Sequence, residues 1–311
     1  MAWPILPARA AYLTLNNSKR RNALSLAVLR DLQEQLIRYN TSAVDGRLRI
    51  LPPFRASILN DLEKVSEGNA SADITSDLAW LLDGEIWRKE REGLPSVIVL
   101  RSEGSVFSSG HDLRELSQLS HEDVKKTFEL CAEVMTLIRW SPTPVVGVIQ
   151  GLATAAGCQL ALTTDLPMAA ADTRLQLPGA SIGLPCTSPS TAVSRKLGAS
   201  LTYRMLALAE PIRAADLPPG TIEIVPDAES LERRVQEVVT KLANQSGAQS
   251  QALGKWAFWT QSGLRGSESG GDGYEEAVHW AGRMMALHAR CDDAKEGITA
   301  FFEKRKPMFK L

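Results

Sequence analysis

Two turns rich in small residues could do chemistry in this sequence: residues 107–113 (FSSGHDL) and residues 151–160 (GLATAAGCQL), each after an apolar run. We expect both turns at the carboxyl ends of parallel strands, where α/β proteins build their sites. The second turn leads into a helix, whose free N–H groups and dipole favour negative charge. Two backbone N–H groups that face one point would make an oxyanion hole. Close packing of a helix on a sheet needs the same small residues, so neither turn alone decides between the two interpretations.

The elements that must position these turns predict an α/β fold. Ser25 and Ser120 are expected to cap helices, and Asp123 stands where a capping box places an acid. Strands and helices alternate, which implies right-handed crossovers in a parallel sheet. The expected strands cover residues 12–15, 96–101, 145–149 and 165–170, and the expected helices cover residues 25–39, 120–140 and 155–162.

The remaining segments are less regular and define the expected domains. Residues 1–205 are predicted to form the core, with an extended insertion at about residues 40–95 that could face a partner and holds a helix-like piece at 75–91. Residues 206–311 are predicted to be mainly helical, with one strand near 221–225. A Gly/Ser-rich surface loop is expected at 262–273, followed by helices over 276–306.

Composition narrows the classes of protein that fit. The 311 residues are 44% hydrophobic and 23% charged, which suits a globular protein with a real core. A net charge of −1 argues against nonspecific nucleic-acid binding, and no apolar run is long enough to cross a bilayer. The four cysteines form no C-x-x-C pair, so we expect reduced thiols and no metal site. Strand-like sequence begins near residue 11, so no secretory signal is expected.

One further motif, residues 179–183 (GASIG), matches the G-x-S-x-G pattern of a serine nucleophile. That nucleophile needs a strand directly before it and a helix directly after it. Pro178 precedes the motif and Pro185 follows it, so a hydrolase that uses Ser181 is disfavoured. The glycine-rich fingerprints of dinucleotide-binding and phosphate-binding loops are absent from the sequence.

Several separated motifs, in order, resemble those of the enoyl-CoA hydratase/isomerase (crotonase) family. The SSGHDL motif and the closing segment are most similar to the branch called enoyl-CoA-hydratase-domain-containing proteins. Residues 40–95 are a longer stretch than the family usually carries there. The motifs lie at residues 15–24 (LNNSKRRNAL), 107–116, 144–171, 177–184 and 296–307 (EGITAFFEKRKP).

This resemblance implies a fold, a ligand and an assembly. The fold would be a spiral of ββα units with a C-terminal helical tail, and residues 206–311 would serve oligomerisation and closure of the coenzyme A pocket. The ligand would be an acyl-CoA thioester, as substrate or bound ligand, with no other cofactor, and the function would belong to fatty-acid or acyl-CoA metabolism. The family usually forms homotrimers or dimers of trimers. Its usual homes are the mitochondrion and the peroxisome, although this sequence shows no clear targeting segment.

The resemblance also assigns site residues. The two N–H donors of the oxyanion hole would be those of His111 and Ala156, the latter at a position that is usually glycine. Gln159 would stand at the position of the first catalytic glutamate. The residues that would contact the substrate or coenzyme A are Lys19, Arg21, Ala23, Ser109, Gly110, Asp112, Gly157, Phe301 and Lys304.

At the positions where the family's hydratases carry catalytic glutamates, this sequence has other residue types. Hydratases use two glutamates, one to accept and one to donate a proton. The first aligns with Gln159 and the second with Gly179, while a third position used by some isomerases falls near Thr187. Because each such group contributes about 10²–10⁴-fold, we expect water addition to be badly impaired. The imidazole of His111 and the thiol of Cys186 are the nearest replacements, and a packed thiol is the simpler interpretation of the latter.

Two functions therefore stay open at the level of sequence. The first is an enzyme whose reaction needs mainly enolate stabilisation, such as isomerisation or decarboxylation. The second is a noncatalytic acyl-CoA-binding or protein-interaction member of the family, with residues 40–95 as the docking surface.

Overall fold

The computed structural model describes residues 3–244, 246–263, 292, 296, 299–300 and 303–308, and its contacts group the chain into two units. The first unit consists of Met1–Tyr39, Val97–Arg139 and Pro144–Lys241. The second unit consists of Asn40–Ser96, Trp140–Thr143 and Leu242–Leu311. The expected domain boundary at residue 205 stays a prediction.

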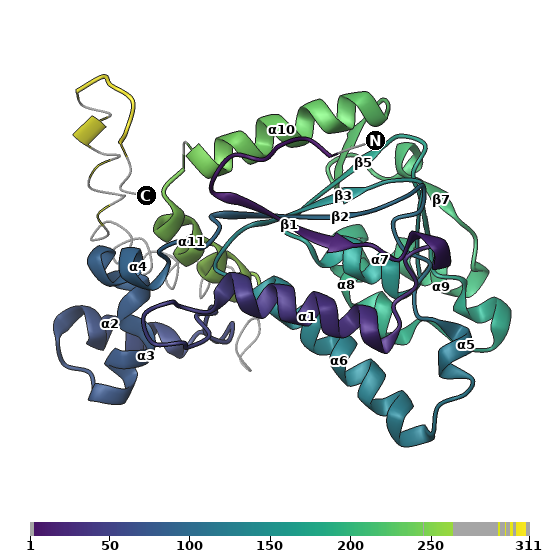
Figure 1. The fold of residues 1–311 in the computed structure, drawn as a ribbon, viewed down its shortest axis with the longest axis horizontal. Helices are drawn as coiled ribbons and strands as arrows, with labels where there is room; N and C mark the ends of the chain where they lie inside the picture. Colours follow the sequence, from purple (N-terminus) through teal and green to yellow (C-terminus); the bar gives the residue numbers. More distant parts are fainter. Residues whose placement is uncertain are drawn as a thin grey trace, which may run out of the picture. The chain divides into compact units, whose positions relative to one another are not determined.

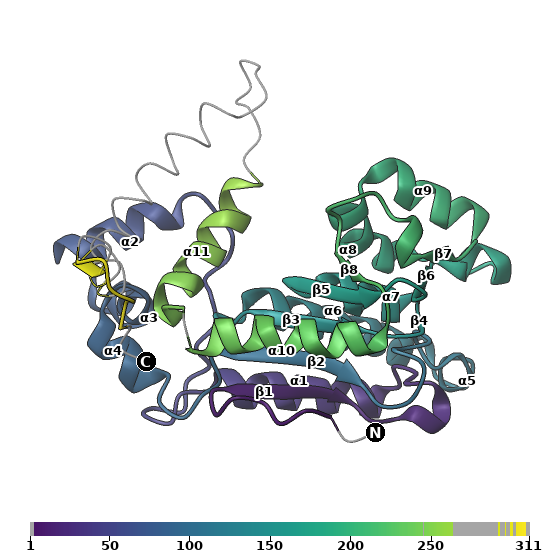
Figure 2. The same cartoon turned by 90° about the horizontal axis from the view of Figure 1, so that it is seen from above.

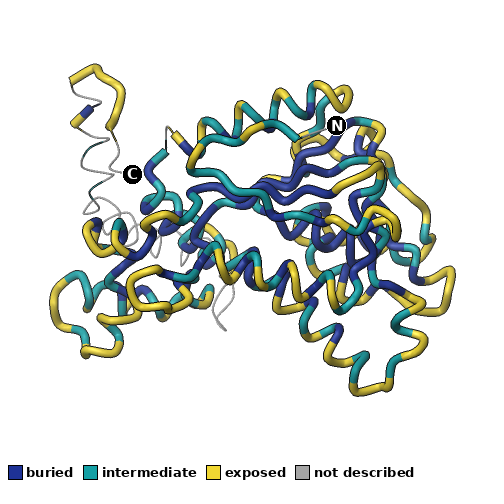
Figure 3. Tube along the Cα trace, viewed as in Figure 1, coloured by how far each residue is buried: buried dark blue, intermediate teal, exposed yellow. Residues whose placement is uncertain are grey.

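A five-stranded parallel sheet forms the centre of the first unit. The sheet confirms the predicted α/β fold, and each of its four strand pairs is parallel. Strands β2 and β3 are buried along their whole length, which explains why both read as continuous apolar runs (Figure 3). In spatial order the strands are β1 (Ala10–Leu15), β2 (Val97–Ser102), β3 (Val145–Ile149), β5 (Leu166–Ala170) and β8 (Glu223–Val225).

Helices cover both faces of this sheet. Helix α10 (Ala228–Asn244) lies on one face, and α1 (Leu26–Asn40) and α6 (His121–Trp140) lie on the other (Figures 1 and 2). The predicted caps are confirmed, since Ser25 Oγ accepts the Val28 N–H at 3.3 Å and Ser120 Oγ accepts the Asp123 N–H at 3.2 Å. These caps satisfy donors that the first helical turn leaves unpaired.

The first unit also contains a second sheet, of three strands, and its first strand directly follows β3 in the sequence. It consists of β4 (Leu152–Thr154), β6 (Arg174–Gln176) and β7 (Ile212–Arg213), too short to show an alternating pattern in the sequence. The other elements of the first unit are the helices α5 (Leu113–Leu116), α7 (Ala156–Thr163), α8 (Thr187–Leu197) and α9 (Ala199–Leu208) and the 3-10 helices η1 (Ser18–Arg20), η2 (Pro178–Ile182) and η3 (Ala214–Asp216).

The second unit has its own helical core. It contains α2 (Ile58–Glu67), α3 (Ala72–Leu82), α4 (Gly84–Glu90) and α11 (Ala248–Gln261), whereas the sequence predicts one helix over residues 75–91 in this stretch. Trp80 and Trp87 stack with ring centroids 5.4 Å apart, and Trp256 is fully buried in the same cluster. Residues 40–95 therefore bury their apolar side chains against a helix that is distant in sequence. No helix within the described ranges combines the length and the hydropathy that a bilayer span requires.

Candidate functional site

The two small-residue turns meet at the carboxyl ends of β2 and β3. Ser108 donates its N–H to Leu152 O at 3.2 Å, and Ser108 O accepts the Thr154 N–H at 3.0 Å. A Cβ placed on Gly110 would lie 2.9 Å from the Cβ of Ala155, and one placed on Gly157 would lie 2.5 Å from Ser108 O. Real Cβ atoms do not approach other atoms so closely. Glycine at both positions therefore allows the two turns to touch.

Two backbone N–H groups at this contact are unused. Within the part of the chain that the structure describes, the N–H groups of His111 and Ala156 donate to no acceptor, whereas the neighbouring Asp112 N–H reaches Leu24 O at 3.4 Å. Ala156 is the first residue of α7, where the helix itself offers no partner for its N–H. Ala155 before it has φ 50° and ψ −123°, a conformation that costs a non-glycine residue about 1–3 kcal/mol. Such a strained residue is typical of sites where the backbone must point in one direction.

The side chain of His111 is used in packing. Its Nδ1 lies 3.3 Å from Leu24 O, and its ring meets Phe128 edge-on with centroids 4.8 Å apart. Burial lowers the pKa of His111 below its usual value, and the hydrogen bond to Leu24 O opposes that effect. The imidazole is therefore neutral at pH 7, with its Nδ1 proton donated to Leu24 O.

Gln159 is buried in α7 with 4% of its surface exposed. Its amide faces Ser188 of α8: Nε2 lies 3.3 Å from Ser188 Oγ, and Oε1 lies 3.4 Å from the same oxygen. An amide cannot exchange a proton as a glutamate does, but it can hold a water or a carbonyl oxygen. Sequence reasoning missed Ser188, because a serine on the exposed side of a helix start carries no distinctive pattern.

The second glutamate position offers no space for a side chain. A Cβ on Gly179 would lie 2.0 Å from Leu184 O and 2.8 Å from Cys186 N. The 3-10 helix η2 thus folds its following loop back over this position. Thr187, near the third position, lies at the exposed start of α8 with Oγ1 3.4 Å from Pro185 O.

The basic turn around residues 19–23 runs alongside the first small-residue turn. Arg21 O accepts the Ser109 N–H at 3.0 Å, and Leu24 donates its N–H to Gly110 O at 2.7 Å. Lys19 and Arg21 are exposed, while Ala23 is buried. The structure therefore brings the backbone of the basic turn against the first small-residue turn.

Asp112 and Lys304 are two further predicted contacts that the structure describes, and a third, Phe301, is not described. The carboxylate of Asp112 caps α5 by accepting the Arg114 and Glu115 N–H groups at 3.1 and 3.2 Å, and it pairs with Arg20 at 2.8 Å. These hydrogen bonds, first that from Glu115, hold the pKa of Asp112 below its usual value, so the group stays ionised. Lys304 is exposed, and Phe301 lies outside the described residues.

The remaining nucleophile candidates are not prepared for attack. Ser181 is exposed within the 3-10 helix η2 and does not lie on a strand-to-helix elbow. Cys186 is buried, and burial raises its pKa above the usual value for a thiol. The same cause raises the pKa of Cys158 to about 12. Both groups are therefore protonated thiols at neutral pH.

The fold and these turns define a crotonase-type protein, and comparison with known sequences agrees. Residues 88–311 match the family model described as enoyl-CoA hydratase/isomerase, and the chain belongs to this family. It is 33% identical to mouse enoyl-CoA hydratase domain-containing protein 3, mitochondrial, over 301 residues that cover 96% of this chain and 80% of the mouse protein. The human protein of that name is 32% identical over 300 residues, covering 96% of this chain and 79% of the human protein.

Solved structures give the same result. A crystal structure of human enoyl coenzyme A hydratase domain-containing protein 3 is similar with a TM-score of 0.70 and 30% identity, covering 97% of each chain. An enoyl-CoA hydratase from Mycobacterium smegmatis is similar with a TM-score of 0.70 and 28% identity, covering 98% of this chain and 97% of the other. These neighbours confirm the crotonase fold expected from the sequence motifs.

Proposed function

We propose that this protein binds an acyl-CoA thioester and polarises its carbonyl group with the backbone N–H groups of His111 and Ala156. The observation that carries the proposal is the pair of unused donors on two touching turns, one of them at the start of α7. A thioester oxygen placed between them would accept both hydrogen bonds, and the helix dipole would favour the negative charge of an enolate. The adjoining basic turn offers Lys19 and Arg21 to the phosphates of coenzyme A.

The chemistry that this site supports best is enolate stabilisation without efficient water addition. Gln159 cannot act as the base, and Gly179 has no side chain to act as the acid. Position 179 is also closed by Leu184 O, so a glutamate from the same backbone position would need the loop to move. Isomerisation or decarboxylation remains within reach, because in both the oxyanion hole supplies the main stabilisation.

The second candidate is an acyl-CoA-binding protein without catalysis. The observation that favours it is that the three acid–base positions hold an amide, a glycine and a threonine hydroxyl, none of which titrates near neutral pH. In this case the hydrogen-bonding N–H pair would serve recognition of the thioester. Gln159 and Ser188 would then hold the acyl group or a water in place.

Calorimetry with turnover measured on the same samples separates these functions. Crotonyl-CoA should bind more tightly than free coenzyme A, with hydration at least about 10²-fold below that expected of a hydratase. Binding without any turnover supports the noncatalytic candidate, and isomerisation of 3-enoyl-CoA supports the enzyme. Absence of binding by either ligand would refute the acyl-CoA proposal and leave the fold alone.

We also propose an oligomeric state and a cellular compartment for this protein from its family membership. We expect a homotrimer or a dimer of trimers, which sedimentation velocity measures directly. Since the similar mouse and human proteins carry the word mitochondrial in their names, a mitochondrial location is the first to test, and a peroxisomal one is the second. Fluorescent fusions at either end of the chain would distinguish the two compartments.

A further inference from the structure

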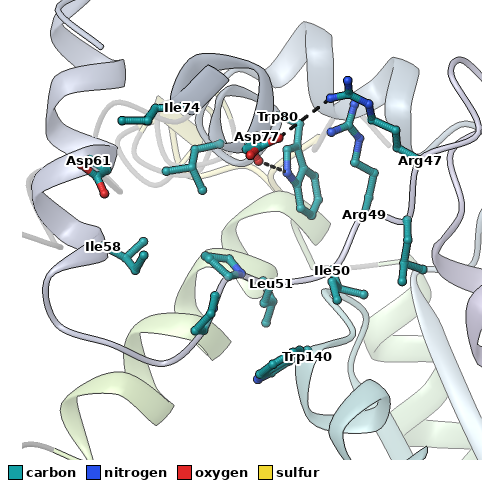
Figure 4. A pocket seen from close by; sticks show the side chains of 14 residues that line it. Arg47, Arg49, Ile50, Leu51, Ile58, Asp61, Ile74, Asp77, Trp80 and Trp140 are labelled. Atoms are coloured by element: carbon teal, nitrogen blue, oxygen red, sulfur yellow. Dashed lines mark hydrogen bonds and ion pairs between the residues drawn. The ribbon is translucent and has the colours of Figure 1, made fainter. Parts of the chain in front are cut away.

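The second unit holds a pocket of about 430 Å³ (Figure 4). Its lining residues all belong to this unit, whereas His111, Ala156 and Gln159 belong to the first. The pocket lies between the segment 47–53, the helices α2 and α3, and Trp140. A volume of this size is in the usual range of small-molecule sites.

Apolar side chains form most of the pocket wall. Leu51, Leu78 and Trp80 are members of the buried core of the unit and present part of their surface to the pocket. Ile58 and Ile74 approach from α2 and α3, as Figure 4 shows. A ligand that fills the pocket must therefore carry an apolar body.

Two arginines line the same pocket, and they differ in how many of their N–H donors already have hydrogen-bond acceptors. The guanidinium of Arg49 is buried and donates to both carboxylate oxygens of Glu90 at 2.9 Å and to Asp45 at 2.8 Å. It is therefore part of the wall, because moving it would break a buried ion pair.

Arg47 is the arginine with unused donors. Its side chain is 56% exposed, and within the described residues it donates one side-chain hydrogen bond, to Ser76 Oγ at 2.9 Å. The carboxylates of Asp45 and Asp77 lie 3.7 and 3.9 Å from it, beyond hydrogen-bond distance. A guanidinium has five N–H donors in a planar fork, so most of those on Arg47 remain available.

We propose that this pocket binds a small carboxylate that carries an apolar body. The carboxylate would take the planar fork of Arg47, and the body would lie against Leu51, Leu78 and Trp80. Asp61 and Asp77 also line the pocket. Because these two carboxylates and Asp45, 3.7 Å from Arg47, all carry negative charge, a phosphate dianion would meet more repulsion in the pocket than a monoanion.

Because Arg47 lies near Asp77, substitutions at these two positions should change ligand affinity in opposite directions, which tests the proposal. Asp77 attracts the same guanidinium that the ligand needs, so the variant Asp77→Asn should bind the carboxylate about two- to fivefold more tightly. The variant Arg47→Gln should bind it about tenfold more weakly. Arg55→Gln is the matched control, since Arg55 is exposed in the same unit and does not line the pocket.

Calorimetry on the full chain would use octanoate, 1-octanol and octyl phosphate as probes. Octanoate should bind more tightly than the other two, and added salt should weaken its binding. The two pocket variants should shift octanoate binding in opposite directions, with the thermal unfolding of each variant recorded as a check on folding. No octanoate binding, binding equal to that of 1-octanol, or binding insensitive to Arg47 and Asp77 would overturn the proposal. None of these outcomes depends on acyl-CoA binding by the first unit.

Discussion

Replacing Gly157 by alanine should separate the two turns that form the proposed oxyanion hole. In an ordinary helix this change stabilises the protein by up to about 1 kcal/mol, because glycine is a poor helix former. Here the new methyl group would lie 2.5 Å from Ser108 O and 2.7 Å from Ser108 Oγ. Forcing a methyl group into a packed contact costs about 1–3 kcal/mol, so after a gain of about 1 kcal/mol the net expectation is a loss of up to about 2 kcal/mol. The residues that must give way belong to the turn that carries the His111 N–H.

Urea unfolding of Gly157→Ala, followed by circular dichroism, measures this loss, and acyl-CoA calorimetry measures its effect on the site. Ser108→Ala alone and the double variant Ser108→Ala/Gly157→Ala complete a double-mutant cycle, because Ser108 Oγ also donates to Asn22 O at 2.8 Å and accepts the Gly110 N–H at 3.2 Å. Gly157→Ala should cost less stability in the Ser108→Ala background than in the wild type, since the contact with Oγ is then absent and the shorter contact with the carbonyl oxygen remains. A variant that is as stable as the wild type and binds acyl-CoA equally well would refute the proposed contact between the turns.

Two further predictions concern buried titratable groups. Because burial lowers the pKa of His111, the unfolded chain binds more protons than the native protein as the pH falls through about 6.5. Stability should then fall by at most about 1.4 kcal/mol per pH unit towards pH 5, and His111→Gln should reduce this slope in urea titrations; an unchanged slope would contradict the assignment. Burial also raises the pKa of Cys131 and Cys158 to about 12 and raises that of Cys186. In a Cys291→Ser background these thiols should react slowly with a disulfide reagent at pH 8 and rapidly after unfolding, whereas rapid reaction of the native protein would disprove their burial.

The sheet of the first unit could be predicted because its signals are local. The apolar runs around β2 and β3 and the serine caps of α1 and α6 each depend on a few neighbouring residues. The strands of the second sheet, two or three residues long, are too short for such a signal. Helix α2 carries no such signal, and the single helix predicted over residues 75–91 is divided in the structure into α3 and α4. Leu59 and Leu62 of α2 are buried in one cluster with Trp256 of α11, so this part of the fold depends on residues far along the chain.

The candidate site likewise combines residues that the sequence identifies with features that only the folded structure shows. Family motifs identify His111, Ala156 and Gln159, and the structure adds that the first two have unused N–H groups. The strained backbone of Ala155 and the contact between Gln159 and Ser188 depend on how distant segments meet. The closed space at Gly179 is likewise a property of the folded loop, so a sequence comparison records the missing glutamate but not the obstacle to it.

The central claim is that the Ala156 N–H binds a thioester oxygen, and one pair of ligands tests it most directly. Butyryl-CoA and its thioether analogue S-butyl-CoA differ in the carbonyl oxygen, so calorimetry of both isolates the hydrogen bonds to that atom. Ala156→Gly keeps the N–H, whereas Ala156→Pro removes it at the first position of α7, a position at which proline suits a helix. Because Ala155 at φ 50° and ψ −123° lies outside the conformations preferred before proline, thermal unfolding of Ala156→Pro and its binding of S-butyl-CoA are recorded as the check on folding. We predict a preference for the thioester of about fivefold or more in the wild type and in Ala156→Gly, and its loss in Ala156→Pro. An equal preference in all three proteins would contradict the proposed oxyanion hole.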